Sequence, residues 1–220
     1  MPVDVLFGGV GVLYCYSLGV AKYLKERYNW ENRIIYSVSG GLFAGYALHR
    51  LTPAQIEERT QSLIQVGSKL PWNPITAEQS YRSLLETLFV GEEWRGLDER
   101  FQLGVTQLPL FQRRVISGPF QSKEELIQAC LSTSYIFPVF FSLPAIYWYV
   151  DGGASRNPPA RVYVSAKRRQ KSLIHRPGRH YSSFRVRTQA EALSLYHEGY
   201  RLAMGKERDI QIRLEENIAL

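Results

Sequence analysis

The chain has 220 residues, of which 45% are hydrophobic, and carries a formal net charge of +7. This length suffices for one well-buried core and is short for two, so we expect a single domain over residues 1–220. No stretch approaches the roughly 18 uncharged apolar residues of a membrane span, and the first residues lack a signal-peptide pattern. The cysteines, Cys15 and Cys130, lie in apolar helical patterns rather than a disulfide framework. We therefore expect a cytoplasmic protein that is peripheral on membranes or lipid droplets.

The positive charge is concentrated in residues 161–187, which contain no Asp or Glu. Between Arg161 and Arg187 lie Lys167, Arg168, Arg169, Lys171, Arg176, Arg179 and Arg185. We expect an exposed basic loop, and an anionic membrane surface or a nucleic acid would both suit it. Aromatic residues are sparse there and no nucleic-acid motif is present, so we expect no nucleic-acid partner. A solvated loop with no partner is the competing interpretation.

The first motif is a glycine-rich turn. Val3 to Phe7 predicts a short strand, Gly8-Gly9-Val10-Gly11 a turn, and the apolar spacing up to Arg27 a helix. A strand, a glycine turn and a helix together present backbone N–H groups to an anion. A dinucleotide site would need a further glycine where Tyr14 stands, so an oxyanion hole is the better use of this loop.

The second motif is a serine at a sharp corner. Residues 33–38 predict a buried strand, Ser39-Gly40-Gly41 a turn, and the small apolar residues up to Leu48 a helix. This pattern is typical of a nucleophile elbow, which exposes a serine hydroxyl at a helix N-terminus. An N-cap serine without chemistry is the alternative.

The middle of the chain predicts scaffolding. Thr52 and Thr76 each begin a capping box, followed by helices to about Val66 and Phe89. Residues 101–108 and 113–116 alternate in polarity and predict an antiparallel hairpin or two adjacent strands. Ser122 caps a helix that ends before Pro138.

The third motif follows the next predicted strand. Residues 146–150 form this strand, which ends at Asp151-Gly152-Gly153, so we expect the carboxylate at the same sheet edge as Ser39. A plain Asp-Gly turn is the alternative. The apolar loop 137–144 either packs into the core or lines a pocket for an apolar substrate. Thr188 caps a last helix to about residue 206, with Leu193, Tyr196, Tyr200 and Met204 on its docked face.

Together the three motifs resemble the patatin-like phospholipase family, and most closely the branch that includes adipose triglyceride lipase. Residues 126–130, 134–139 and 149–153 with Asn157-Pro158 also resemble that family in order and spacing. The resemblance covers most of residues 3–160, leaving the basic loop 161–187 and the helix 188–206 as additions.

The resemblance implies a three-layer α/β/α fold with a mainly parallel central sheet. It implies a lipid acyl hydrolase, of the phospholipase A or triacylglycerol lipase type, that needs no metal or cofactor and acts on a lipid ester, with transacylase activity as an extension. Ser39 would be the nucleophile and Asp151 its base. The oxyanion hole would be formed by Gly8, Gly9, Val10 and Gly11, and the supporting turns by Gly41, Gly152 and Gly153.

Two alternatives stay open. The chain has Ser37 where the family's elbow usually begins with glycine, and Tyr14 where its loop usually ends in glycine, which favours a catalytically weakened lipid-binding module. The other alternative is a Ser-Asp-His catalytic triad. Its histidine would be His175, His180 or His197, which follow Asp151, or His49, which follows the elbow helix. The lipid class and the oligomeric state do not follow from the sequence.

Overall fold

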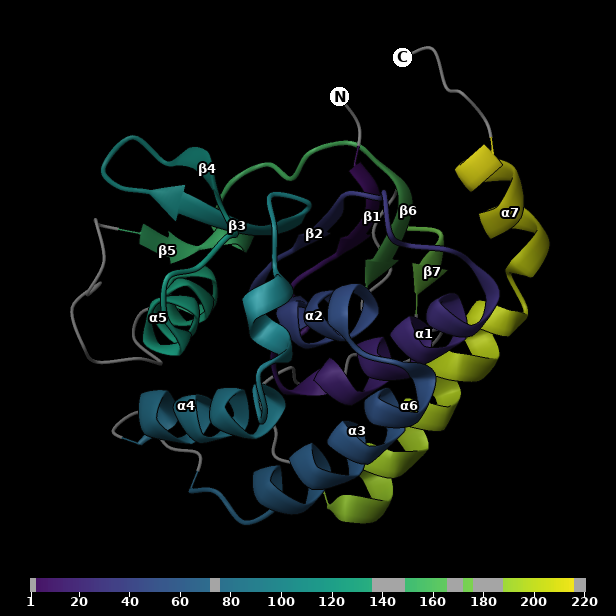
Figure 1. Cartoon of the computed structure of the whole chain (residues 1–220), viewed down its shortest axis with the longest axis horizontal. Helices are drawn as coiled ribbons and strands as arrows, with labels where there is room; N and C mark the ends of the chain where they lie inside the picture. Colours follow the sequence, from purple (N-terminus) through teal and green to yellow (C-terminus); the bar gives the residue numbers. More distant parts are fainter. Residues whose placement is uncertain (1–2, 72–75, 136–148, 166–171, 176–187, 216–220) are drawn as a thin grey trace.

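The computed structural model describes residues 3–71, 76–135, 149–165, 172–175 and 188–215 (Figure 1). The central sheet runs in the order β4-β3-β2-β1-β6-β7. Its parallel strands are β1 (Val3–Phe7), β2 (Ile35–Ser37), β3 (Phe101–Gln107), β6 (Ala160–Ser165) and β7 (Ile174–His175). The antiparallel strand β4 (Gln112–Ser117) forms the edge beside β3. The predicted α/β fold with a mainly parallel sheet is confirmed.

The strand β5 (Tyr149–Asp151) enters the sheet beside β3. It pairs antiparallel with β3, opposite residues 105–107. Strand β4 pairs with one side of β3 along nearly its whole length. The other side of β3 is shared between two strands: β2 pairs with residues 101–103, and β5 pairs with the residues beyond them. Asp151 therefore does not lie at the carboxyl end of a parallel strand. It lies inside the sheet, at the point where the short strand β2 has ended.

Seven helices accompany the sheet in the described residues. They are α1 (Tyr14–Arg27), α2 (Leu42–Arg50), α3 (Pro53–Gly67), α4 (Ala77–Leu88), α5 (Lys123–Ser134), α6 (Gln189–Met204) and α7 (Glu207–Glu215). Figure 1 shows α1 and α2 against the sheet, with α3, α4 and α6 beyond them. None of these helices has both the length and the apolar content that crossing a membrane requires. Short 3-10 turns, η1 (Gly11–Leu13), η2 (Ser39–Gly41), η3 (Glu93–Gly96) and η4 (Gly152–Ala154), link the elements.

The predicted helix starts are largely confirmed. Complete capping boxes begin α3 at Thr52 and α6 at Thr188, and the Ser122 hydroxyl accepts the Glu125 N–H at the start of α5. The capping box predicted at Thr76 is wrong. Its hydroxyl donates instead to the Pro71 carbonyl oxygen, and so it does not cap α4.

Residues 161–187 are not one basic loop. Arg161 and the next four residues belong to β6, which pairs with β1 inside the sheet, and β7 lies further along the same stretch. The reason is visible in the alternation of Val162, Tyr163 and Val164, because both valines are fully buried. The remaining residues of the basic stretch, 166–171 and 176–187, lie outside the described part of the chain.

The docked face of α6 agrees with the prediction in part: Tyr196 is buried and Tyr200 packs against the core, but the other two expected residues are exposed. Leu193 and Met204 are 41% and 49% exposed, whereas Leu195 and Ala203 are buried. The close approach of α6 to α1 sets this rotation. A Cβ atom added to Gly199 would overlap the Tyr16 carbonyl oxygen, and one added to Gly19 would overlap the Tyr196 carbonyl oxygen. Two glycines therefore decide which face of α6 is buried.

This contact gives a stability prediction. Gly199→Ala should lower the free energy of unfolding by about 1 to 3 kcal/mol, because the added methyl group forces α1 and α6 apart. The matched control is Gly205→Ala, where the new Cβ would meet its nearest atom, the Arg201 carbonyl oxygen, at 3.6 Å. Urea unfolding of both variants measures the difference. Equal stability of the two variants would contradict the close packing.

Candidate active site

The Ser39 turn has the backbone of a nucleophile elbow. Val38 is extended, and Ser39 follows with a φ of +52°, in the left-handed region that non-glycine residues rarely adopt. The chain then enters α2 directly at Leu42. Cβ atoms on Gly40 and Gly41 would overlap the carbonyl oxygens of Gly11 and Phe7, so only glycine fits after the serine. The turn therefore packs against the glycine loop at the end of β1.

The two departures from the family pattern are both accommodated away from the turn. Ser37 points its hydroxyl towards α2, where a Cβ atom on Gly45 would overlap it. Tyr14 is buried, stacks on Phe43 at 4.6 Å and donates its hydroxyl to the Leu63 carbonyl oxygen at 3.2 Å. Both side chains therefore point away from the Ser39 turn.

The glycine loop lies beside Ser39. An ideal Cβ on Gly9 would lie 3.5 Å from the Ser39 Cβ and 3.9 Å from Val38 Cγ1. The Gly8 N–H already donates to the Val164 carbonyl oxygen at 2.9 Å, so the N–H groups that follow it are the better candidates for binding an anion. Gly11 has a φ of +55° and starts η1, which leads into α1. The loop thus passes close to Ser39 before it leads into α1.

Asp151 reaches the same place from the opposite direction. It pairs with Val105, two residues beyond Leu103, the partner of Ser37. At about 3.3 Å per residue, Asp151 lies about 7 Å further along β3 than Ser37. Ser39 is also two residues past Ser37, and the intervening Val38 is extended, so Ser39 and Asp151 stand at the same level of the sheet.

The turn after Asp151 completes this convergence. The Gly153 N–H donates to Asp151 Oδ1 at 2.6 Å, which fixes the orientation of the carboxylate. An ideal Cβ on Gly153 would lie 3.9 Å from Val38 Cγ1, the same methyl group that lies near Gly9. A Cβ on Gly152 would overlap the Gly104 carbonyl oxygen. All three predicted motifs therefore meet around Val38.

The C-terminal end of α5 holds both halves of the site, and sequence reasoning missed this role. Thr133 is fully buried; its hydroxyl accepts the Ser39 N–H at 3.2 Å and donates to the Gly104 carbonyl oxygen. Two residues later, the Tyr135 carbonyl oxygen accepts the Asp151 N–H at 2.8 Å. The polar run 132–134 at the end of an apolar helix was the available signal.

Further hydrogen bonds surround Asp151. The Thr106 hydroxyl lies 3.0 Å from both the Asp151 carbonyl oxygen and the Ser155 hydroxyl. Nearby, the buried Tyr81 hydroxyl pairs with the Ser134 hydroxyl at 2.7 Å. Burial, with a smaller contribution from the negative charge of Asp151, raises the pKa of Tyr81 well above its usual value. Tyr81 therefore stays protonated beside the site.

The described histidines lie away from the Ser39 turn. His49 is seven residues into α2, about 10 Å along its axis, and lies 3.3 Å from Asp98. Burial lowers the pKa of His49, and a hydrogen bond from Arg100 lowers the pKa of Asp98 to about 2. His175 in β7 is three strands, or roughly 14 Å, from β2. His197 lies on α6, and His180 lies outside the described residues.

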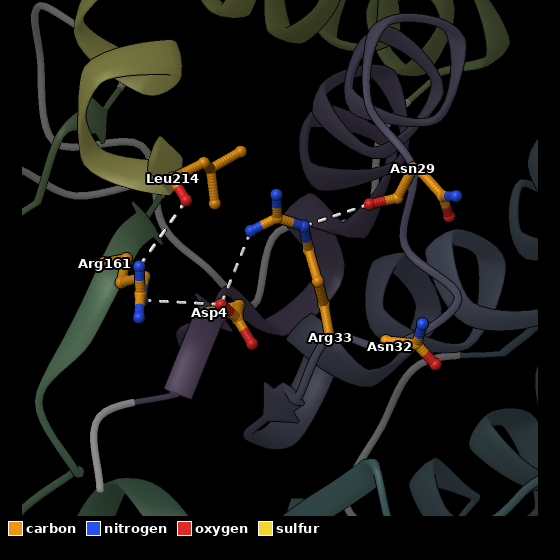
Figure 2. Close-up of a pocket in the computed structure, with 6 residues that line it drawn as sticks. All are labelled: Asp4, Asn29, Asn32, Arg33, Arg161 and Leu214. Carbon is orange, nitrogen blue, oxygen red and sulfur yellow. Dashed lines mark hydrogen bonds and ion pairs between the residues drawn. The ribbon is translucent and has the colours of Figure 1, made fainter. Parts of the chain in front are cut away.

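A separate polar pocket lies at the opposite end of the strands, where β1, β2 and β6 begin (Figure 2). Its volume is about 390 Å³. Asp4 is its centre, with Arg33 and Arg161 each 3.5 Å from Asp4 Oδ1 and the Ile34 N–H donating to Oδ2 at 2.8 Å. These bonds join the starts of β1, β2 and β6. The pocket is thus built around a clamp on the strand starts, far from the convergence around Val38.

The described residues contain no group of three His, Cys, Asp or Glu side chains that could hold a metal ion. The apolar loop 137–144, a candidate lining for a substrate pocket, lies outside the described residues.

The fold and the turn are those of α/β proteins with a nucleophile elbow. The family model described as "Patatin-like phospholipase" matches residues 5–164, well over half of the chain. The chain therefore belongs to the patatin-like phospholipase family, whose general activity is the hydrolysis of lipid acyl esters.

Curated relatives share part of the chain. Patatin-like phospholipase domain-containing protein 2 of Rattus norvegicus is 32% identical over 171 residues, which is 71% of this chain and 35% of that protein. The Bos taurus and Homo sapiens proteins of the same name are each 29% identical over 170 residues, 71% of this chain and 34% and 33% of their own lengths. The chain thus spans about a third of the length of these relatives.

The bridge through Thr133 gives a second prediction. Thr133→Val keeps the shape but removes the hydroxyl, which leaves the Ser39 N–H without this acceptor and should lower the free energy of unfolding by about 1 to 3 kcal/mol. Thr133→Ser is the matched control, because it keeps the hydroxyl and loses only a methyl group, worth about 0.8 kcal/mol. Chemical unfolding compares the two. A valine variant as stable as the serine variant would argue against the bridge.

Proposed function

We propose that the chain is a serine lipid acyl hydrolase in which Ser39 is the nucleophile and Asp151 is its general base. The observation that carries this proposal is the meeting of the Ser39 turn, the glycine loop and the Asp151 turn around Val38. Membership of the patatin-like phospholipase family supports a lipid ester as the substrate.

In the first step, the Ser39 hydroxyl oxygen attacks the ester carbonyl carbon while its proton passes to the Asp151 carboxylate. A hydroxyl is a weak nucleophile until a base accepts its proton, and the bond from the Gly153 N–H keeps the Asp151 side chain oriented for this task. The negative charge that develops on the carbonyl oxygen is stabilised by the N–H groups of Gly9, Val10 and Gly11. Each such donor contributes about 3 to 4 kcal/mol in well-studied hydrolases.

In the second step, the tetrahedral intermediate collapses and the proton held by Asp151 passes to the departing alcohol, leaving an acyl group on Ser39. Water, deprotonated by Asp151, then attacks the acyl carbon, and the fatty acid leaves as Ser39 regains its proton. If the hydroxyl of a second lipid replaces water, the product is a new ester. We include this transacylation in the proposal, because the same residues serve both reactions.

The finer assignment rests on the relatives. The 29 to 32% identity to patatin-like phospholipase domain-containing protein 2, together with the motif resemblance, supports the branch that includes adipose triglyceride lipase. A net charge of +7 supports action at an anionic membrane or lipid-droplet surface. Phospholipids and triacylglycerols are therefore the substrates to assay first.

A catalytically weakened lipid-binding module is the second candidate. Its support was the presence of Ser37 and Tyr14 at positions where glycine is usual. The contact of Ser37 with Gly45 and the burial of Tyr14 against Phe43 direct both side chains away from the turn, which favours the enzyme.

The decisive test is substitution of the two proposed catalytic residues. Ser39→Ala and Asp151→Asn should each reduce ester hydrolysis at least about a thousandfold, because one removes the nucleophile and the other removes the base while keeping an oxygen for the Gly153 N–H. A fluorophosphonate probe should label the wild-type chain at Ser39 and leave Ser39→Ala unlabelled. Circular dichroism checks folding, and full activity in Asp151→Asn would remove the dyad.

The histidine triad has its own test. His49→Gln, His175→Gln, His180→Gln and His197→Gln should each retain hydrolysis within about threefold of the wild type, because in the dyad no imidazole relays the proton. The four variants are assayed on the same short-chain ester. A loss of about ten-thousandfold in one folded variant would identify that histidine as the base and replace the dyad with a triad.

A further inference from the structure

The turn between β3 and β4 exposes a pair of large apolar side chains. Leu110 is 72% exposed and Phe111 is 63% exposed, the highest values among the large hydrophobic residues described. Phe111 has a φ of +51°, an unusual backbone for an aromatic residue. Val115, on the neighbouring strand, is 46% exposed. The turn therefore carries an apolar tip with no cover from the described part of the chain.

The tip lies beyond the carboxyl ends of the parallel strands, at the same end of the sheet as the candidate active site. Strand β3 runs parallel to β1 and β2, so its carboxyl end leaves the sheet where β2 gives way to the Ser39 turn. Asp151 pairs with Val105, five residues before Leu110. Tyr149 pairs with Gln107, so β5 runs inwards from the tip towards Asp151. A surface that met the tip would face the site.

Positive charge lies just behind the tip. Arg113 and Arg114 are both exposed, and they leave opposite faces of β4 because successive side chains of a strand alternate. Residues 101–123 contain no Asp or Glu, so no acidic neighbour in this segment offsets the two charges. Arg113 follows Phe111 by two residues and lies on β4, just beyond the turn. Interfacial apolar side chains enter a bilayer by about 5 to 10 Å, so charged groups just behind them lie near the head groups.

We propose that the β3–β4 turn, with Leu110 and Phe111 at its tip and Arg113 and Arg114 behind, docks the protein on an anionic lipid surface. The apolar pair enters the boundary between head groups and acyl chains, while the two guanidinium groups bind lipid phosphates. Docking in this way turns the edge that carries Ser39 and Asp151 towards the lipid. This orientation rests on the proposed function, whereas the docking itself does not.

A second copy of the chain is a less suitable partner for the β3–β4 turn than a lipid surface. Strand β4 is the edge of the sheet, and pairing of two such edges would bring Arg113 and Arg114 of both copies together. Charged side chains on an edge strand oppose this kind of association. Phosphates of a lipid surface, by contrast, complement the charge.

The test measures binding to vesicles of phosphatidylcholine, with and without phosphatidylserine, by co-sedimentation. All variants carry Ser39→Ala, so that the lipid is not consumed. L110S with F111S should lower the partition coefficient about tenfold or more on both vesicles. R113Q with R114Q should lower it about tenfold on the anionic vesicles at low salt and leave neutral vesicles unaffected. Binding equal to the parent chain in both pairs would overturn the proposal.

Matched controls remove similar groups elsewhere. L193S with M204S removes apolar side chains that are 41% and 49% exposed on α6, and R208Q removes an exposed positive charge on α7. These variants should bind as the parent does. Loss of self-association in the tip variants on sedimentation, with unchanged vesicle binding, would instead assign the turn to a second copy.

A second measurement separates docking from catalysis. With Ser39 restored, the tip variants should hydrolyse a short-chain soluble ester at the wild-type rate and lose about tenfold on vesicle substrates. A chain that hydrolyses no ester, yet loses vesicle binding in the tip variants, would refute the proposed function and keep the docking. Slower hydrolysis of the soluble ester by the tip variants would overturn the assignment of the turn to docking alone.

Discussion

The arrangement of the site depends on the hydrogen bonds at the carboxyl end of α5. The Thr133 hydroxyl holds the Ser39 N–H and the Gly104 carbonyl oxygen, and the Tyr135 carbonyl oxygen holds the Asp151 N–H. One helix end thus spans three segments that are far apart in the chain. Because Ser39 adopts a left-handed backbone, its N–H turns out of the sheet and needs a partner from another element. A buried hydroxyl supplies that partner and holds the strained turn in place.

Strand β3 determines where the two proposed catalytic residues stand. Its edge is divided between β2, which ends after three residues, and β5, which enters antiparallel from the other side. The shortness of β2 therefore leaves room for Asp151, since a longer strand would occupy its place. The same strand continues into the exposed turn at Leu110 and Phe111. The candidate site and the proposed docking turn are consequently linked through the same strand, β3.

Glycines, which have no Cβ atom, allow the close backbone contacts that build both the site and the scaffold. Gly40 and Gly41 let the serine turn rest on the carbonyl oxygens of the glycine loop, and Gly45 leaves room for the Ser37 hydroxyl. A serine at the start of the elbow is thus compatible with the turn because a glycine faces it on α2. In the outer layer, the close approach of α1 and α6 depends on the same property.

The sequence by itself determined the local elements: the Ser39 turn, the glycine loop after Phe7, and the capping boxes at Thr52 and Thr188. These follow from short-range sterics and hydrogen bonds, which a few neighbouring residues decide. Only the tertiary structure decided the antiparallel entry of β5, the bridge through Thr133 and the buried face of α6. Each of these depends on which strand edge is vacant or how closely two backbones approach, and such long-range constraints leave no periodic signal in the chain.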